Sequence, residues 1–281
     1  MRRSPRPALL AAGALMLGVW GPAVPAAGQA SVPVLAKLTL VEQPVERQDG
    51  ATSWRQAVEG QPVRIGENLR TGPVGLARLE LPWMVLTLSP SSTVAFPDEF
   101  LLSASLETGR VVVASESRDA LKLVTSEAAV RGKGRAVIRR EGGRTLVSCL
   151  EGRFLVEGAG GGVWLDGGEG TVVASGGRPL APQPTPEPPP TLSLVPGRDP
   201  VYVAPGDPLE LHWSSAEPAF QVEILPVGSD YVLIQRDVGP PPARVAIPWG
   251  GAFRWRIASR DDRGLEGRPS GDGQIAVELA R

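Results

Sequence analysis

The sequence contains one cysteine and one histidine among 281 residues, and these two shortages exclude several chemistries. Cys149 cannot form a disulfide within the chain, so we expect it to be a buried apolar side chain rather than a reactive thiol. One Cys and one His are too few for a zinc site unless carboxylates supply the other ligands. His212 has no evident nucleophile or orienting partner nearby, so it does not predict a catalytic base.

The sequence also lacks an excess of positive or negative charge, and it lacks the loop motifs of common enzyme classes. The net charge of -1 gives no electrostatic footprint for nucleic acid. The chain has no Gly-x-Ser-x-Gly elbow and no phosphate-binding loop of the Walker type. The acidic turns at 166–170 and 259–264 offer too few oxygens for calcium. We therefore predict no enzymatic activity and no cofactor; an enzyme would need a cleft built from carboxylates alone.

Only one long apolar run is present, at 8–20, and it resembles a secretory signal. Arginines at 2, 3 and 6 precede it, and the small residues at 21–30 suit cleavage after Ala26 or Ala30. A membrane-spanning helix needs about 20 apolar residues, which is more than this run supplies. We expect residues 1–30 to be a signal peptide and the protein to be periplasmic or secreted, from a bacterium. Retention of 1–30 as an anchor is the alternative.

Glycine and proline are plentiful, with 34 and 29 residues, as is typical of many short strands joined by turns. Between 31 and 177 apolar and polar residues alternate, which predicts half-buried strands. The stretch IGENLRTGPVGLARLELPWMVLTL, at 65–88, shows both features. The residues that we expect in its core are Leu69, Leu79, Leu81, Leu86 and Leu88. The fold class predicted is all-β, with many short, mostly antiparallel strands.

Seven prolines between 178 and 190 predict a stiff linker, which would span roughly 40 Å if fully extended. A docking site for a proline-reading module is the alternative. Residues 191–281 show about seven alternating runs, the count expected of an immunoglobulin-like sandwich. Trp213 and Trp255 fall on its inward phase. The domain plan is thus 1–30 signal, 31–177 first β domain, 178–190 linker and 191–281 second β domain.

Four blocks in the first β domain resemble the FecR domain family. They are VERQDGATSWRQAVEGQPVRIGENLRTGPVGLARLEL (45–81), LETGRVVV (106–113), the stretch 121–158 and VWLDGGEGTVV (163–173). The resemblance covers about 32–175; Glu67, the turn at 82–83 and RGKG at 131–134 depart from the family pattern. It implies an extracytoplasmic β domain. Well-known members also carry a cytoplasmic segment that controls a sigma factor, and only about seven residues precede the apolar run here, so we do not expect that activity. The segment 253–270 resembles the last strands of fibronectin type III-like domains.

Two sets of residues are candidates for partner binding. In the basic stretch 131–144, alternation places Arg135, Val137 and Arg139 on one face, which could meet an anionic glycan, a lipid headgroup or a protein. A solvated strand face is the alternative. Arg70 and Thr71 could contact a partner or could bond to the local turn. Three tryptophans in turns or strand ends could stack on sugars or seal domain edges: Trp83, Trp164 and Trp249.

The function predicted from the sequence is that of a non-enzymatic exported protein that binds or scaffolds at the cell envelope. Its partner would be an envelope polymer or an envelope protein, not nucleic acid, and it would have no stable membrane span once the signal is cleaved. The alternative is a membrane-anchored FecR-type signal transducer that relays a periplasmic contact.

Overall fold

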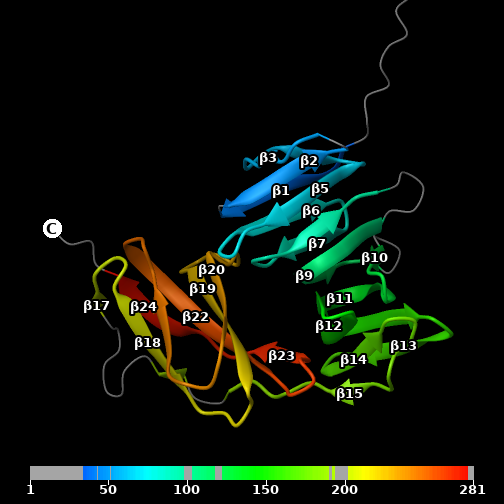
Figure 1. The fold of residues 1–281 in the computed structure, drawn as a ribbon. Helices are drawn as coiled ribbons and strands as arrows, with labels where there is room; N and C mark the ends of the chain where they lie inside the picture. The colour runs from blue at the N-terminus through cyan, green and yellow to red at the C-terminus, as the bar shows by residue number, and fades with distance from the viewer. Residues whose placement is uncertain are drawn as a thin grey trace, which may run out of the picture. The chain divides into compact units, whose positions relative to one another are not determined.

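The computed structural model describes residues 34–42, 44–50, 52–97, 103–117, 122–189, 192–193 and 202–277. All regular elements in these ranges are strands, so the all-β prediction is confirmed (Figure 1). Val32–Arg281 form one compact unit. The predicted signal at 1–30 lies outside the described residues. Within the described ranges, no helix has the length and hydrophobicity needed to cross a membrane.

Fifteen strands form one large sheet. They are β1 (Val34–Glu42), β2 (Val45–Asp49), β3 (Arg55–Gln56), β4 (Pro62–Arg64), β5 (Glu67–Thr71), β6 (Leu76–Leu81), β7 (Met84–Leu88), β8 (Thr93–Ala95), β9 (Ser103–Ser115), β10 (Lys122–Val124), β11 (Ala128–Glu141), β12 (Arg144–Gly158), β13 (Gly161–Asp166), β14 (Glu169–Ala174) and β15 (Gln183–Pro184). The main order is β15-β14-β12-β11-β10-β9-β7-β6-β1-β4. Only β9 and β10 run parallel; the other described pairings in this sheet are antiparallel.

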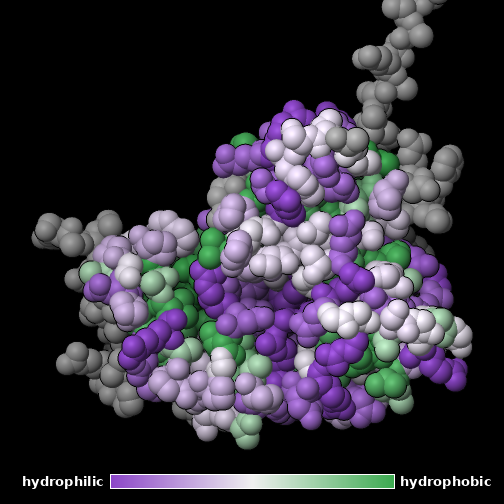
Figure 2. Space-filling model, in the orientation of Figure 1, coloured by the Kyte–Doolittle hydropathy of each residue, from purple (hydrophilic) through white to green (hydrophobic). Residues whose placement is uncertain are grey.

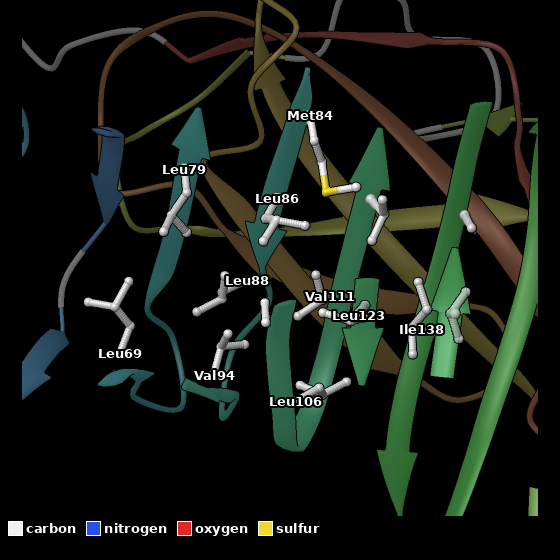
Figure 3. Packing of buried hydrophobic residues seen from close by; sticks show 14 of the residues in the cluster. Leu69, Leu79, Met84, Leu86, Leu88, Val94, Leu106, Val111, Leu123 and Ile138 are labelled. Atoms are coloured by element: carbon white, nitrogen blue, oxygen red, sulfur yellow. The ribbon is translucent and has the colours of Figure 1, made fainter. Parts of the chain in front are cut away.

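Alternating leucines and valines build the core of this sheet. Figure 3 shows them pointing to one side from neighbouring strands, among them Leu79, Leu86, Leu88, Val111 and Ile138. Burying each such side chain contributes about 1.5–3 kcal/mol. Of the five leucines expected in the core, four are fully buried, and Leu81 is partly buried against the same cluster.

Two glycines let the long strands β11 and β12 cross closely at their bulge. Gly134 and Gly152 lie opposite each other with φ of 120° and 79°. A Cβ on either glycine would collide with the backbone of the other strand, at Glu151 or at Lys133. The RGKG sequence that departs from the FecR pattern therefore serves this crossing.

The remaining strands form two smaller sheets. A three-stranded sheet contains β16 (Leu192–Ser193), β18 (Pro208–Trp213) and β21 (Ala243–Ala246). A six-stranded sheet contains β17 (Tyr202–Val203), β19 (Ala219–Pro226), β20 (Ile234–Val238), β22 (Gly251–Arg260), β23 (Glu266–Pro269) and β24 (Gly273–Val277). Residues of both sheets share one core, in which Trp213 and Trp255 are both buried. Trp213 packs edge-on against Phe220, with ring centroids 5.0 Å apart. Membership of the immunoglobulin or fibronectin III class stays a prediction.

The outer face of the large sheet is also covered. Val112, Val137 and Leu150 form a second buried cluster on the central strands. Nearby, Leu265, from the turn before β23, packs on Leu146 and Val172. The backbone N–H of Glu266 donates to Ser148 Oγ at 2.9 Å, so β23 is fastened to β12. The C-terminal strands therefore cover part of the large sheet.

The proline-rich segment 178–189, predicted to be a stiff linker, is hydrogen-bonded to the edge of the large sheet. β15 pairs with β14, the N–H of Leu180 donates to the Val172 carbonyl at 3.1 Å, and that of Thr185 donates to the Gly168 carbonyl at 2.9 Å. Proline is tolerated on an edge strand because its missing donor can face away from the ladder. The domain boundaries themselves stay predictions.

Candidate functional site

Two pockets open where the C-terminal strands cover the large sheet. The junction pocket, of about 400 Å³, lies between the turn Ser89–Ser91 and residues of β9, β11, β19 and β20. The arginine pocket, of about 280 Å³, lies between Arg135 and Glu151 of the large sheet and residues 268–272. Hydrophilic residues occupy the middle of the face shown in Figure 2. The two pockets differ in how many of their charged side chains form ion pairs.

Thr71 and Gly72 hold the turn Ser89–Ser91, which lines the junction pocket, and do not themselves line it. The hydroxyl of Thr71 donates to the Ser89 carbonyl at 2.6 Å and accepts the N–H of Ser92 at 2.9 Å. Ser91 has a left-handed backbone, with φ of 56°, and its N–H donates to the Gly72 carbonyl at 2.9 Å. Thr71 is buried, so it serves the turn and does not present a contact surface.

Three of the four arginines that line the junction pocket are paired with carboxylates, and the fourth, Arg236, donates to the Gln235 carbonyl at 3.0 Å. Arg110 donates to both oxygens of Glu266, through Nε at 2.9 Å and through Nη2. Arg139 donates to Asp237 at 3.0 Å, and Arg140 holds Glu127 with bonds of 2.9 and 3.1 Å. Paired charges of this kind join elements of the fold. We therefore interpret this pocket as a structural junction.

The pKa shifts agree with a junction of satisfied charges. Burial alone would raise the pKa of Asp237, but Arg139 and Arg260 outweigh it and hold this pKa below its ordinary value. Burial likewise opposes ionisation of Glu223, and Arg256 and Arg110 again leave its pKa lowered. Both carboxylates are thus stabilised in the charged form.

Arg135 in the arginine pocket is different. Its side chain is half-buried on β11, and no hydrogen bond or ion pair links it to the other described residues. Burial lowers its pKa, the nearby positive charge of Arg256 lowers it further, and the attraction of Glu223 and Glu151 does not outweigh these two effects. A cation in this environment is stabilised by an anion that approaches it.

Two further arginines line the same pocket from other strands. Arg256, on β22, donates to Glu223 at 2.7 Å. Arg268, on β23, donates through Nε to the Leu150 carbonyl at 2.7 Å and has no carboxylate partner among the described residues. The pocket also contains Glu151 and Asp272, and Asp272 is already paired with Arg254 at 2.6 Å. Three guanidinium groups from three strands against two carboxylates leave the lining with a net charge of +1.

The four residues predicted from the sequence lie in three places. Arg135 lines the arginine pocket, while Arg139, on the same face, is buried in the junction. Arg70 pairs with Glu46 at 2.7 Å and lies 4.2 Å from the ring centroid of Trp54. Arg70 therefore has local partners. Sequence reasoning missed Arg256 and Arg268, which lie far along the chain from the basic stretch.

The other candidates have local roles in the described structure. His212 lies 3.0 Å from Glu210 on the outer face of β18. Cys149 is buried, and its burial raises its pKa to about 11, which keeps the thiol protonated. The Arg153 guanidinium lies 5.0 Å from the ring centroid of Trp164, and Trp83, Trp164 and Trp249 are all exposed. Across the described ranges, no group of three or more His, Cys, Asp or Glu could hold a metal ion.

No model of a known protein family matches the chain, and no curated protein is similar in sequence. Among solved structures, two crystal structures of a "putative anti-sigma factor" from Parabacteroides distasonis are similar over 42% of this chain and 59% of that one, at 17% identity and a TM-score of 0.36. A DUF3823 family protein from Bacteroides ovatus matches 88% of this chain and 91% of its own length, at 10% identity and a TM-score of 0.18. The match thus spans less than two thirds of the Parabacteroides protein. Similarities this weak support no functional argument.

Proposed function

We propose that this chain is a non-enzymatic exported protein that binds an anionic component of the cell envelope through the arginine pocket. The observation that carries the proposal is Arg135, a half-buried guanidinium with a lowered pKa and with no hydrogen bond or ion pair among the described residues. A partly buried charge without an ion pair is costly, because it is desolvated. Proteins therefore seldom keep such a charge unless it has a functional role. The resemblance to FecR domains and the predicted signal at 1–30 support an extracytoplasmic setting.

The position of the arginine pocket on packed strands supports binding to a surface or polymer. The residues of the arginine pocket belong to β11, β12, β22, β23 and the turn that follows β23, and hydrogen bonds between β12 and the β23 region hold them. A site on packed strands presents its charges in a fixed geometry. Such a site needs no conformational change to receive a charged group that projects from a polymer, a lipid or a protein.

The test is capture of envelope material by the exported chain, residues 31–281. Arg135→Gln removes the unpaired charge, and Arg244→Gln is the control, since Arg244 is 75% exposed on β21 and lies outside the pocket. The wild type and Arg244→Gln should retain the same anionic envelope fraction, and Arg135→Gln should lose it. Equal capture by all three proteins, or none by the wild type, would disprove the function. Intact mass of the exported protein separates a released chain from an anchored one.

A further inference from the structure

We infer that the arginine pocket recognises a tetrahedral phosphate ester, as found in sugar phosphates, phosphate-linked polymers and lipid headgroups. This inference rests on the proposed binding function and adds the chemistry of the ligand. It follows from where the three arginines come from, from which of their charges are unpaired, and from what else lines the pocket.

The arginines come from three different strands. Arg135 comes from β11 of the large sheet, and Arg256 and Arg268 come from the neighbouring strands β22 and β23 of the six-stranded sheet, so the guanidinium groups are supplied by three strands of two sheets. A carboxylate has two oxygens in one plane and can be satisfied by a single guanidinium fork. A phosphate ester presents two or three anionic oxygens around a tetrahedral centre, so several arginines from different elements suit it.

The available charge also fits a phosphate ester. Arg256 is already paired with Glu223, which leaves Arg135 and Arg268 to meet a ligand. Asp272 is paired with Arg254, so Glu151 is the one lining carboxylate left to oppose them. A diester carries one negative charge and a monoester about 1.5 to 2 at neutral pH, so either can offset the unpaired arginines.

The rest of the lining favours a small polar group over a peptide. Beyond charged residues, the pocket offers Ser270, Gly271, Pro269 and Leu150. No atoms lie within 4 Å of a Cβ built on Gly271, so the turn at 270–272 leaves room beside the arginines. With about 280 Å³, the site is at the small end of the range for ligand pockets. It can hold a phosphate and part of a sugar or glycerol but has few apolar surfaces for amino-acid side chains.

The experiment is titration calorimetry of residues 31–281 with defined probes. Glucose 6-phosphate tests the phosphate group, tri-galacturonate tests carboxylates on a sugar, and maltotriose is the neutral sugar. Vesicles of phosphatidylglycerol, with phosphatidylcholine as the comparison, test a lipid source of the same group. Arg135→Gln and Arg268→Gln are measured beside Arg244→Gln, and urea midpoints show whether each variant is folded.

We expect glucose 6-phosphate to bind, to displace phosphatidylglycerol vesicles, and to bind about tenfold or more weakly to Arg135→Gln and Arg268→Gln. Arg244→Gln should bind like the wild type, and Arg135→Lys should recover only part of the affinity because it lacks the fork. Three outcomes would overturn the inference: equal or tighter binding of tri-galacturonate, unchanged affinity in Arg135→Gln, or binding to vesicles without binding to glucose 6-phosphate. If envelope capture persists while no phosphate compound binds, the binding function stands and the phosphate inference fails. If both are absent, both fail.

Discussion

At the scale of single residues, Arg135 and Arg139 have different roles although the sequence pattern places both on the same face of β11. They lie four positions apart on β11, and neither is fully exposed to solvent. Arg139 donates to Asp237 at 3.0 Å, whereas Arg135 has no partner among the described residues. The first arginine therefore stabilises the fold, and the second is left for a ligand.

This contrast predicts opposite effects of two substitutions that remove the same charge. Arg139→Gln removes charged hydrogen bonds from Asp237 and should reduce the free energy of unfolding by about 1.5–3 kcal/mol. Arg135→Gln relieves a desolvated cation that faces Arg256, so stability should stay the same or rise. Urea denaturation of both variants at pH 7 measures the difference. A large loss of stability in Arg135→Gln would mean that Arg135 has a structural role and would remove the basis of the proposed site.

At the scale of elements, the proline-rich segment 178–189 behaves as an edge strand. The N–H groups of Leu180 and Thr185 donate to carbonyls of the large sheet, at 3.1 and 2.9 Å. We expect these two amides to exchange with deuterium much more slowly than in the unfolded chain. Hydrogen exchange measured on peptides covering 178–189 tests this, with the same peptides in denaturant as the reference. Full exchange at the earliest time would show that the segment is a free linker.

The alternating strands were predictable because side chains on a strand point to opposite faces in turn. The pattern therefore identified the all-β class and core residues such as Leu79 and Leu86. The second buried face was missed, although runs such as Val111–Val113 and Ala136–Ile138 carry its signal. Three successive apolar residues on a strand indicate that both faces are covered. The arginine pocket forms where the C-terminal strands pack on the large sheet, because only this packing brings Arg256 and Arg268 close to Arg135.

At the scale of the whole molecule, buried ion pairs join the large sheet to the C-terminal strands. Arg110, on β9, binds Glu266, on β23, and lies 4.0 Å from Glu223, on β19. Such pairs contribute little net free energy relative to apolar packing, but breaking one leaves a buried charge without its partner. The junction therefore depends on all of these carboxylates remaining ionised.

This dependence predicts acid-sensitive stability with a definite sign. Interactions with arginine hold the pKa of Glu223 below its ordinary 4.5 and that of Asp237 below its ordinary 3.8, against the opposing effect of burial. A carboxyl whose pKa is lower in the folded state stabilises the protein above its unfolded pKa, and this contribution is lost as the pH falls through the folded value. Stability should thus be level between about pH 6 and 8 and should decline once the pH drops below about 4.5. Glu42, whose pKa is raised by burial and by Glu59, acts in the opposite direction.

The urea midpoint measured from pH 3 to pH 8 tests the contribution of the junction as a whole. Asp237→Asn should be less stable than the wild type at pH 7, because Arg139 and Arg260 lose a charged partner. It should also lose less stability on acidification, since one of the responsive carboxyls is gone. The two curves should therefore converge as the pH approaches 3. Parallel curves over the whole range would show that Asp237 does not couple the junction to pH, and a midpoint that rises on acidification would contradict the role assigned to the buried ion pairs.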